Sequence, residues 1–427
     1  MKTSRLHTMI QNGGLDRQWR ALGIPEEELE GQRQRSIVAL EHFIKLYGDG
    51  EISIFSSPGR SEIGGNHTDH QNGKVLAAAV HLDMLALVRA ADDITLVSEG
   101  YPAISISAET SEPEASEQGT TVALIKGVLA GMQARGYRIG GFQAYVTSNI
   151  PTGAGLSSSA AFEVLIGTIL SVLYNEGEIS PIEVAMIARY AENVYFGKPC
   201  GLMDQTACAV GNAVFIDFKE PEKPVTEQIN IELQQAGYCL CITDTKGSHA
   251  DLTDEYASIT KEMGQVAGYF NQKVLREVSM EELFRNMKAL RDAYGDRAVL
   301  RSIHYLNENE RVDEEIAALK SGDFAAFLDA VKRSGDSSYK YLQNIYAGSD
   351  VHHQNLALAI SLSEMWLRGR GACRVHGGGF AGTIQAMVPA EDAQDYCIYM
   401  DSFFGEKSCR ILNIRKCGAV SVKSEEM

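Results

Sequence analysis

One stretch, residues 150–161, governs the interpretation of the rest of this chain. It reads Ile150-Pro151-Thr152-Gly153-Ala154-Gly155-Leu156-Ser157-Ser158-Ser159-Ala160-Ala161. A polar, strand-like run from Phe142 to Asn149 leads into it, and a long apolar helical run follows it. Its glycines allow unusual dihedrals and close approach to a ligand, and its serines lie at an expected helix start, where free N–H groups and the helix dipole favour an anion. The pattern favours a phosphate-binding loop over the alternative, a plain helix N-cap after a tight turn.

The size and composition of the chain set its broad class. With 427 residues it exceeds the usual size of one hydrophobic core, which predicts two domains. A hydrophobic fraction of 44% and a charged fraction of 22% are typical of a globular protein. The net charge of −17 and a pI near 5.1 leave no excess of Lys and Arg to neutralise phosphates. We therefore expect no nucleic-acid partner.

The cysteines and the apolar runs indicate a compartment. Eight cysteines are scattered along the chain, and none shows a Cys-x-x-Cys spacing, which predicts reduced, mostly buried thiols and no zinc site. The N-terminus carries no apolar signal region, and no apolar run is long enough to span a bilayer. We expect a cytoplasmic protein that does not bind a membrane.

The order of strands and helices predicts an α+β fold in which short strands are followed by helices. Residues 1–35 form an N-terminal extension to which we assign no function, and apolar residues at helical spacing predict a helix over Ser36–Tyr47. The run 219–224 has the composition of a linker. We therefore expect domains over residues 36–218 and 219–427.

A long polar loop, residues 57–73, lies between two apolar strand-like runs. Loops of this length inside a compact domain are usually functional or disordered. Four of its side chains suit hydrogen bonds to a polyol: Arg60, Asn66, His67 and Asp69. His67-x-x-His70 would be a metal pair only with a further ligand, which the sequence does not supply. The alternative is a solvated loop whose turn residues bond to one another.

Two carboxylates flank a well-punctuated helix in the middle of the chain. Ser180 is a capping residue, Pro181 suits the first helical position, and Gly197 ends the helix. Glu192 lies near its end, and Asp204 follows shortly after the break. An Asp in such a place is usually a helix N-cap, which is the alternative to a chemical role.

A run of glycines, Gly377-Gly378-Gly379-Phe380-Ala381-Gly382, precedes a strand over Thr383–Val388. Consecutive glycines mark backbone that packs closely against something. Another backbone segment and a ligand edge are equally good candidates.

Four of these motifs occur in the order found in galactokinases, which belong to the galacto-, homoserine, mevalonate and phosphomevalonate (GHMP) kinases. They are Pro58-Gly59-Arg60 through Asp69, the stretch 153–160, the run Cys200-Gly201-Leu202-Met203-Asp204-Gln205, and Gly377 to Gly382. The resemblance extends roughly from residue 40 to residue 420 and omits the N-terminal extension. It implies a two-domain α+β fold, with a ribosomal-protein-S5-like N-terminal domain, a ferredoxin-like C-terminal domain and the active site between them. It also implies transfer of the ATP γ-phosphate to the anomeric hydroxyl of a sugar, most simply galactose.

The same resemblance implies roles for individual residues. The ATP phosphates would be wrapped by Gly153, Ala154, Gly155, Leu156, Ser157, Ser158 and Ser159. Ser159 and Glu192 would contact Mg²⁺, for which hydroxyl and carboxylate oxygens are suitable ligands. Asp204 would be the catalytic aspartate, accepting the hydroxyl proton or orienting the hydroxyl, with Arg60 as its partner. The sugar would be bound by Asn66, His67, Asp69 and Tyr256. The stretch contains no Gly-x-x-x-x-Gly-Lys-[Ser/Thr], which excludes a P-loop as its explanation.

The sugar loop departs from the family pattern. Galactokinases typically read Arg-x-Asn-Leu-Ile-Gly-Glu-His-x-Asp-Tyr, and this chain reads Arg60-Ser61-Glu62-Ile63-Gly64-Gly65-Asn66-His67-Thr68-Asp69-His70. The family glutamate, which contacts the sugar near its 6-hydroxyl, is Asn66 here, and the tyrosine is His70. We therefore consider acceptors altered at C6, such as galacturonate or L-arabinose, as an alternative to galactose. A second alternative is a non-catalytic sensor of sugar and ATP, which the intact Arg60 and Asp204 argue against. We expect a monomer or a weak homo-oligomer.

Overall fold

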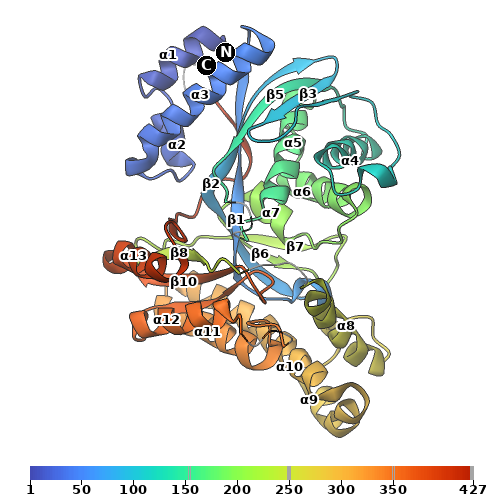
Figure 1. Ribbon diagram of the computed structural model, residues 1–427. Helices are drawn as coiled ribbons and strands as arrows, with labels where there is room; N and C mark the ends of the chain where they lie inside the picture. The colour runs from blue at the N-terminus through green and yellow to red at the C-terminus, as the bar shows by residue number, and fades with distance from the viewer. Residues whose placement is uncertain (152, 154, 248–251, 349, 351, 424–427) are drawn as a thin grey trace.

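The computed structural model describes the chain except for residues 152, 154, 248–251, 349, 351 and 424–427. Figure 1 shows two sheets, one in the upper half of the molecule and one in the lower half, each covered by helices. Within the described residues, no helix has the length and apolar character needed to cross a membrane.

The first sheet is built on the long hairpin of β1 (Ser53–Gly64) and β2 (Lys74–Ala91), which are antiparallel. Its main path runs in the order β12-β1-β2-β5-β3-β4, and β6 and β7 continue from the other half of β2. The remaining strands are β3 (Ile94–Ser98), β4 (Ile104–Ile106), β5 (Gly141–Ser148), β6 (Ala213–Asp217), β7 (Val225–Ile229) and β12 (Val420–Val422). The pairing of β1 with β2 shifts register between Pro58 and Arg60 and again between Glu62 and Gly64. Such bulges bend a strand and redirect its side chains.

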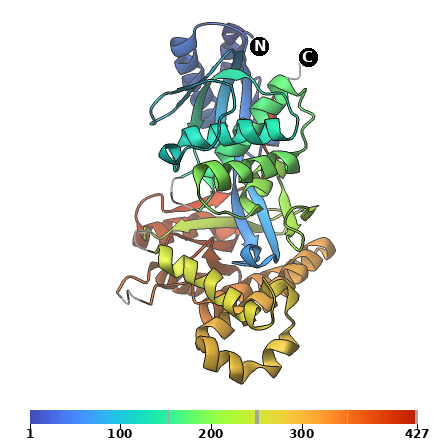
Figure 2. The ribbon, with the colours of Figure 1, turned by 90° about the vertical axis from the view of Figure 1, so that its right-hand side faces the viewer.

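Alternation along the strands gives this sheet two apolar faces. Ile54, Leu85 and Leu87 belong to one cluster, whereas Phe55, Ala86 and Val88 belong to another. Two helices pack on the second face, α5 (Ser158–Tyr174) and α7 (Met203–Val210), and α4 (Thr121–Ala134) and α6 (Pro181–Tyr190) pack against these helices. Figure 2 shows these helices in front of the sheet and the blue N-terminal helices behind it. The sheet is therefore buried on both faces.

The N-terminal extension covers the first face. It comprises α1 (Thr3–Gln11), α2 (Asp16–Ala21) and the start of α3 (Leu29–Tyr47). Trp19 is fully buried and joins the cluster of Ile54, Leu85 and Leu87. The expectation that the helix begins at Ser36 was wrong, because the polar turn Gln32–Arg35 continues the helix towards Leu29.

The second sheet has the order β11-β8-β10-β9 and is antiparallel throughout. Its strands are β8 (Tyr238–Asp244), β9 (Ala372–His376), β10 (Thr383–Pro389) and β11 (Cys409–Leu412). Its helices are α8 (Thr253–Tyr269), α9 (Met280–Arg285), α10 (Met287–Ser321), α11 (Phe324–Ser337), α12 (Asn355–Leu367) and α13 (Ala393–Phe404). One face packs on α12 and α13, and Leu240 and Ile242 on the other face join the main core of the first sheet. The two sheets therefore share one apolar core.

The domain boundaries at 35/36 and 218/219 remain predictions. The first boundary falls inside α3, and strand pairing extends the first sheet beyond the second boundary, because β7 pairs with β6. The C-terminus also returns to the first sheet, where β12 pairs with β1.

A buried carboxylate joins the extension, the hairpin and the C-terminal segment. Asp83 on β2 is fully buried and bonds Arg35 of α3, and Arg415 lies 3.6 Å from its second oxygen. Ser56 donates to Asp83 and accepts a 2.6 Å bond from Arg415. Burial would raise the pKa of Asp83, but the charges of Arg35 and Arg415 lower it below its usual 3.8.

We expect Asp83→Asn to lower the free energy of unfolding by about 3–5 kcal/mol at pH 7, because it leaves buried guanidinium groups unpaired. Urea unfolding measures this change. Because the folded pKa lies below the unfolded one, the contribution of Asp83 is fully present above the unfolded pKa and is lost as pH falls through the folded pKa. Asp292→Asn, which breaks only an exposed pair with Lys288, serves as control and should cost less than about 0.5 kcal/mol. Equal unfolding free energies for Asp83→Asn and the parent would contradict this role.

Candidate active site

The centre of the site is a two-pronged ion pair between strand β1 and helix α7. Arg60 donates from Nε to Asp204 Oδ1 at 2.8 Å and from Nη2 to Asp204 Oδ2 at 2.9 Å. The arginine side chain is 8% exposed and the aspartate side chain 32% exposed, so the pair rests on a buried guanidinium and opens to solvent at the carboxylate. Asp204 is the second residue of α7, after the cap Leu202, so the N-cap interpretation of Asp204 was wrong.

The pair fixes the charge of Asp204. Burial would raise its pKa, but the charge of Arg60 and hydrogen bonds from Arg60 and Ser157 lower it below 3.8. The carboxylate is therefore ionised across the physiological range. Both of its oxygens are already hydrogen-bonded, which fixes its orientation.

The glycine-serine loop is hydrogen-bonded to Arg60 of this pair. The Arg60 amide donates to Leu156 O at 3.1 Å, and the guanidinium also bonds Gly155 O. Ser157 precedes α5 with a φ of 52°, and Ser158 and Ser159 are the first residues of the helix, as expected. Gly153 and Gly155 are exposed. The loop thus presents the N-terminus of α5 next to Asp204, an arrangement suited to an anion. Ala154 lies outside the described residues.

Gly155 also approaches the second sheet. A Cβ on Gly155 would lie 3.0 Å from Thr383 Oγ1 and 3.1 Å from His376 Nδ1. His376 is buried on β9, bonds Thr383 at 3.0 Å, and accepts from the Glu62 amide at 3.2 Å. Burial and then the charge of Arg60 lower the pKa of His376 well below 6.5, so the ring is neutral. His376 therefore lies between the glycine-serine loop and β1.

A second group of carboxylates lies beside the helix start. Glu192 is 3% exposed within the short π-helix Ala191–Phe196, and its two oxygens accept from Lys198 at 3.1 Å and from Gln205 at 2.7 Å. Gln205 also bonds Glu163 at 3.2 Å. Glu163 is fully buried, and burial followed by the charge of Glu192 raises its pKa to about 9.

Oxygen donors therefore gather next to the phosphate loop. Glu163 follows Ser159 by one helical turn on α5, and its Oε1 has no hydrogen-bond partner among the described residues. Within that same part of the chain, no group of three His, Cys, Asp or Glu side chains is arranged to hold a metal alone. The donor set suits a hard cation such as Mg²⁺ whose shell is completed by phosphate oxygens and water.

Two of the expected sugar-binding residues, His67 and Asp69, follow the end of β1. His67 has a φ of 57° and bonds Gly378 O at 2.8 Å through Nε2. Asp69 Oδ2 lies where any side chain at Gly201 would collide, because a Cβ there would be 2.4 Å away. Burial, reinforced by Glu62, raises the pKa of Asp69 against the opposing effect of His67. Gly201 is thus the residue that lets the Asp204 loop approach Asp69.

Asn66 differs from its expected role. The residue is fully buried, and its amide donates to Glu62 Oε1 at 3.0 Å and to Gly377 O at 2.7 Å. Its oxygen accepts from Asn344 at 2.9 Å and from Ser338 at 3.3 Å. The expectation that this side chain bonds a sugar hydroxyl conflicts with the structure, because all four of its hydrogen-bonding positions are used by the protein.

Tyr256 and the glycine loop support each other. The Tyr256 hydroxyl donates to Gly379 O at 2.7 Å, and a Cβ on Gly378 would lie 2.5 Å from the tyrosine ring. Burial raises the pKa of Tyr256 to about 12. Of the two interpretations left open for the glycines, packing against another backbone segment applies to Gly379, where a Cβ would collide with Asn344 O, whereas Gly378 packs against the Tyr256 side chain. By contrast, Cβ on Gly377 would meet no described atom within 4 Å.

Sequence reasoning missed several residues of this site. Glu163 had one available signal, a lone carboxylate in an otherwise apolar helix. Arg374 and His376 had a different signal, because they are polar residues that alternate with apolar ones just before the glycine run. His304 and Glu308 on α10, which bond the backbone of Asn66 at 2.9 and 3.3 Å, had none, because nothing in the local sequence links α10 to the loop.

Comparisons with known proteins identify the family of the chain. The model of the GHMP kinases N terminal domain matches residues 123–212, and the galactokinase galactose-binding signature matches residues 41–90. The galactokinase of Streptomyces coelicolor is 30% identical over 355 residues, covering 82% of this chain and 88% of that protein. The galactokinase of Thermotoga petrophila is 33% identical over 335 residues, covering 77% and 87%.

Solved structures show the same fold. The galactokinase of Lactococcus lactis complexed with galactose superposes with a TM-score of 0.74 at 24% identity, over 89% of this chain and 98% of that one. A mevalonate kinase superposes with a TM-score of 0.57 at 15% identity, over 84% and 99%. The expected two-domain α+β fold is therefore confirmed.

Replacing Arg60 by Met should raise the pKa of Asp204 above 3.8, because burial then acts without the opposing guanidinium. A ¹³C titration of the Asp204 carboxyl by NMR measures this shift. Arg33→Met, which removes the partner of Asp16 at a remote pair, should leave Asp204 unchanged. An unaltered or lower pKa in Arg60→Met would show that Arg60 does not set the charge of Asp204.

Proposed function

Because the chain belongs to the galactokinase family of GHMP kinases, we propose that it transfers the γ-phosphoryl group of ATP to the anomeric hydroxyl of D-galactose. The observation that carries the proposal is the Arg60–Asp204 pair, which bonds the residues before α5 and whose arginine lies on the same segment as His67 and Asp69. Phosphoryl transfer depends mainly on positioning and on stabilising the charge of the transferring oxygens. A fixed carboxylate beside a helix N-terminus can serve both needs.

We propose that Asp204 orients the sugar hydroxyl rather than acting as a strong base. An effective base has a pKa near the working pH, whereas the pKa of Asp204 is lowered below 3.8. A loose transition state needs little deprotonation before the phosphoryl group moves. Arg60 holds the carboxylate ionised and correctly turned.

We propose Ser159 and Glu192 as the residues that hold Mg²⁺ with the nucleotide. The ion would neutralise phosphate charge. Gln205 donates a hydrogen bond to Glu192 and positions it, and the same Gln205 amide also donates to Glu163. The residues 153–159 would then surround the phosphates, with the Ser158 and Ser159 amides facing them.

We propose that His67, Asp69 and Tyr256 lie around the sugar, and that the enzyme works in the cytoplasm as a monomer or a weak homo-oligomer. All eight cysteines are unpaired, which agrees with a reducing compartment. A sugar altered at C6, such as galacturonate or L-arabinose, is the second candidate acceptor. It is favoured by the neutral and fully occupied side chain at position 66.

The acceptor is tested by measuring kcat/KM for galactose, galacturonate and L-arabinose with ATP. We expect galactose to be used, with less than a hundredfold preference over at least one of the other two, because position 66 supplies no negative charge to repel a C6 carboxylate. A preference of several orders of magnitude for galactose would remove the second candidate. Binding of sugar and ATP without any ADP formation in the whole panel would favour the non-catalytic sensor instead.

Asp204→Ala should reduce kcat at least a thousandfold while the Kd for ATP stays within about threefold, because the carboxylate contacts the acceptor side of the site. ADP release measures kcat, and calorimetry measures the Kd for ATP. Asp395→Ala on the exposed side of α13 serves as a control for folding and assay conditions. Undiminished turnover in Asp204→Ala would mean that another group performs its role.

A further inference from the structure

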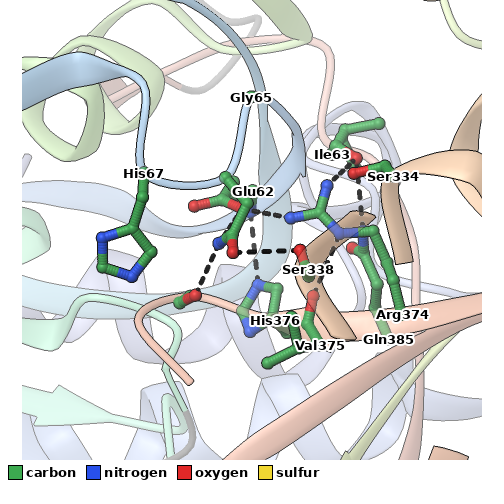
Figure 3. A network of polar contacts seen from close by, with 12 residues as sticks. Glu62, Ile63, Gly65, His67, Ser334, Ser338, Arg374, Val375, His376 and Gln385 are labelled. Carbon is green, nitrogen blue, oxygen red and sulfur yellow. Dashed lines mark hydrogen bonds and ion pairs between the residues drawn. The ribbon is translucent and has the colours of Figure 1, made fainter. Parts of the chain in front are cut away.

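A second buried ion pair is made by Glu62, two residues after Arg60 on β1. Glu62, near the end of β1, bonds Arg374 of β9, and the two side chains are 6% and 0% exposed. Arg374 also donates to Ile63 O at 2.8 Å and to Val375 O at 3.0 Å. Figure 3 shows the guanidinium between these groups, with Gln385 beside it. Arg374 therefore holds the carboxylate of Glu62 in one position.

The carboxylate of Glu62 accepts a hydrogen bond from the side-chain amide of Asn66. Glu62 Oε1 accepts from Asn66 Nδ2 at 3.0 Å, and the second amide hydrogen goes to Gly377 O at 2.7 Å. Since the Asn66 oxygen accepts from Asn344 and Ser338, the amide cannot rotate without breaking bonds in a fully buried place. The side-chain amide of Asn66 therefore points towards protein groups.

We propose that Glu62 is a specificity-determining positioning residue: by binding Asn66 in place, it leaves the acceptor site without a charge or a free amide at position 66. The inference rests on the proposed function, because it concerns the acceptor of that same site. It predicts that the carboxylate at position 62 and the amide at position 66 act as one unit.

The order of the two residue types supports this coupling. This chain has Glu62 and Asn66 where the galactokinase pattern that it resembles has Asn and Glu, so the two chemical groups stand in exchanged places. In the structure the exchanged groups are hydrogen-bonded to each other. A carboxylate at both positions would place two like charges at hydrogen-bond distance in a buried site, with Arg374 as the near cation. One carboxylate is therefore accommodated, and its position decides what the acceptor meets.

The experiment is a double-mutant cycle on Glu62→Asn and Asn66→Glu. We expect Asn66→Glu alone to lower kcat/KM for the sugar at least a hundredfold through KM, with KM for ATP within threefold of the parent. The double variant should recover at least tenfold of that loss. It should also change the ratio of kcat/KM for galactose over galacturonate at least tenfold in favour of galactose, because the carboxylate has moved to position 66.

The control is Asp83→Asn, which unpairs another buried carboxylate from its arginines and should lower Tm without altering the acceptor ratio. Glu62→Gln covers the case in which the double variant does not fold. It keeps the shape but weakens the hold on Asn66, so it should raise the sugar KM at least fivefold at an unchanged ATP KM.

The possible results separate the two proposals. Three results would overturn the role of Glu62 while the parent still phosphorylates a sugar. They are additive effects in the cycle, an unchanged acceptor ratio in the double variant, and an unchanged sugar KM in Glu62→Gln. A parent that phosphorylates none of galactose, galacturonate and L-arabinose overturns the proposed function and this inference with it.

Discussion

The site depends on the paired hydrogen bonds between Arg60 and Asp204. Arg60 is carried by the bulged part of β1, and Asp204 by the first turn of α7, so the pair closes a contact between elements 144 residues apart. The same guanidinium bonds the backbone of the phosphate loop, and its charge keeps Asp204 ionised. Because a buried guanidinium is costly without a partner, the three segments hold each other in place.

Close backbone approach is the second constraint. Gly201 leaves room for the carboxylate of Asp69, Gly155 leaves room for Thr383 and His376, and Gly378 leaves room for the ring of Tyr256. In each case a side chain would collide with a group from a different segment. The glycines therefore bring the sugar loop, the phosphate loop and the second sheet within hydrogen-bond distance of one another.

Buried charge is distributed unevenly around the site. Asp204 and Glu62 each bond an arginine, and the pKa of Asp204 is lowered. Among the described residues no salt bridge joins Glu163 to a cation, and its pKa is raised to about 9. The carboxylate lacking a direct cation is the one beside the expected Mg²⁺ ligands, where a metal ion would supply the missing charge.

The local sequence by itself determined the helix that starts at the serines and the glycine-serine loop before it, because these features depend on neighbouring residues. The family, the fold and the expected pairing of Arg60 with Asp204 were implied by the resemblance that four ordered motifs carry. The local sequence could not determine that α3 begins at Leu29, because Gln32 and Arg35 are polar and give no core signal there.

Only the tertiary structure decided the direction of Asn66 and the importance of Glu62 and Glu163. The partners of Asn66 come from Gly377 and Asn344, 311 and 278 residues away, and those of Glu62 and Glu163 come from separate strands and helices. A side chain points towards the hydrogen-bond partners that remain after burial, and those partners are fixed by how the two sheets pack, not by the residues beside it in the chain.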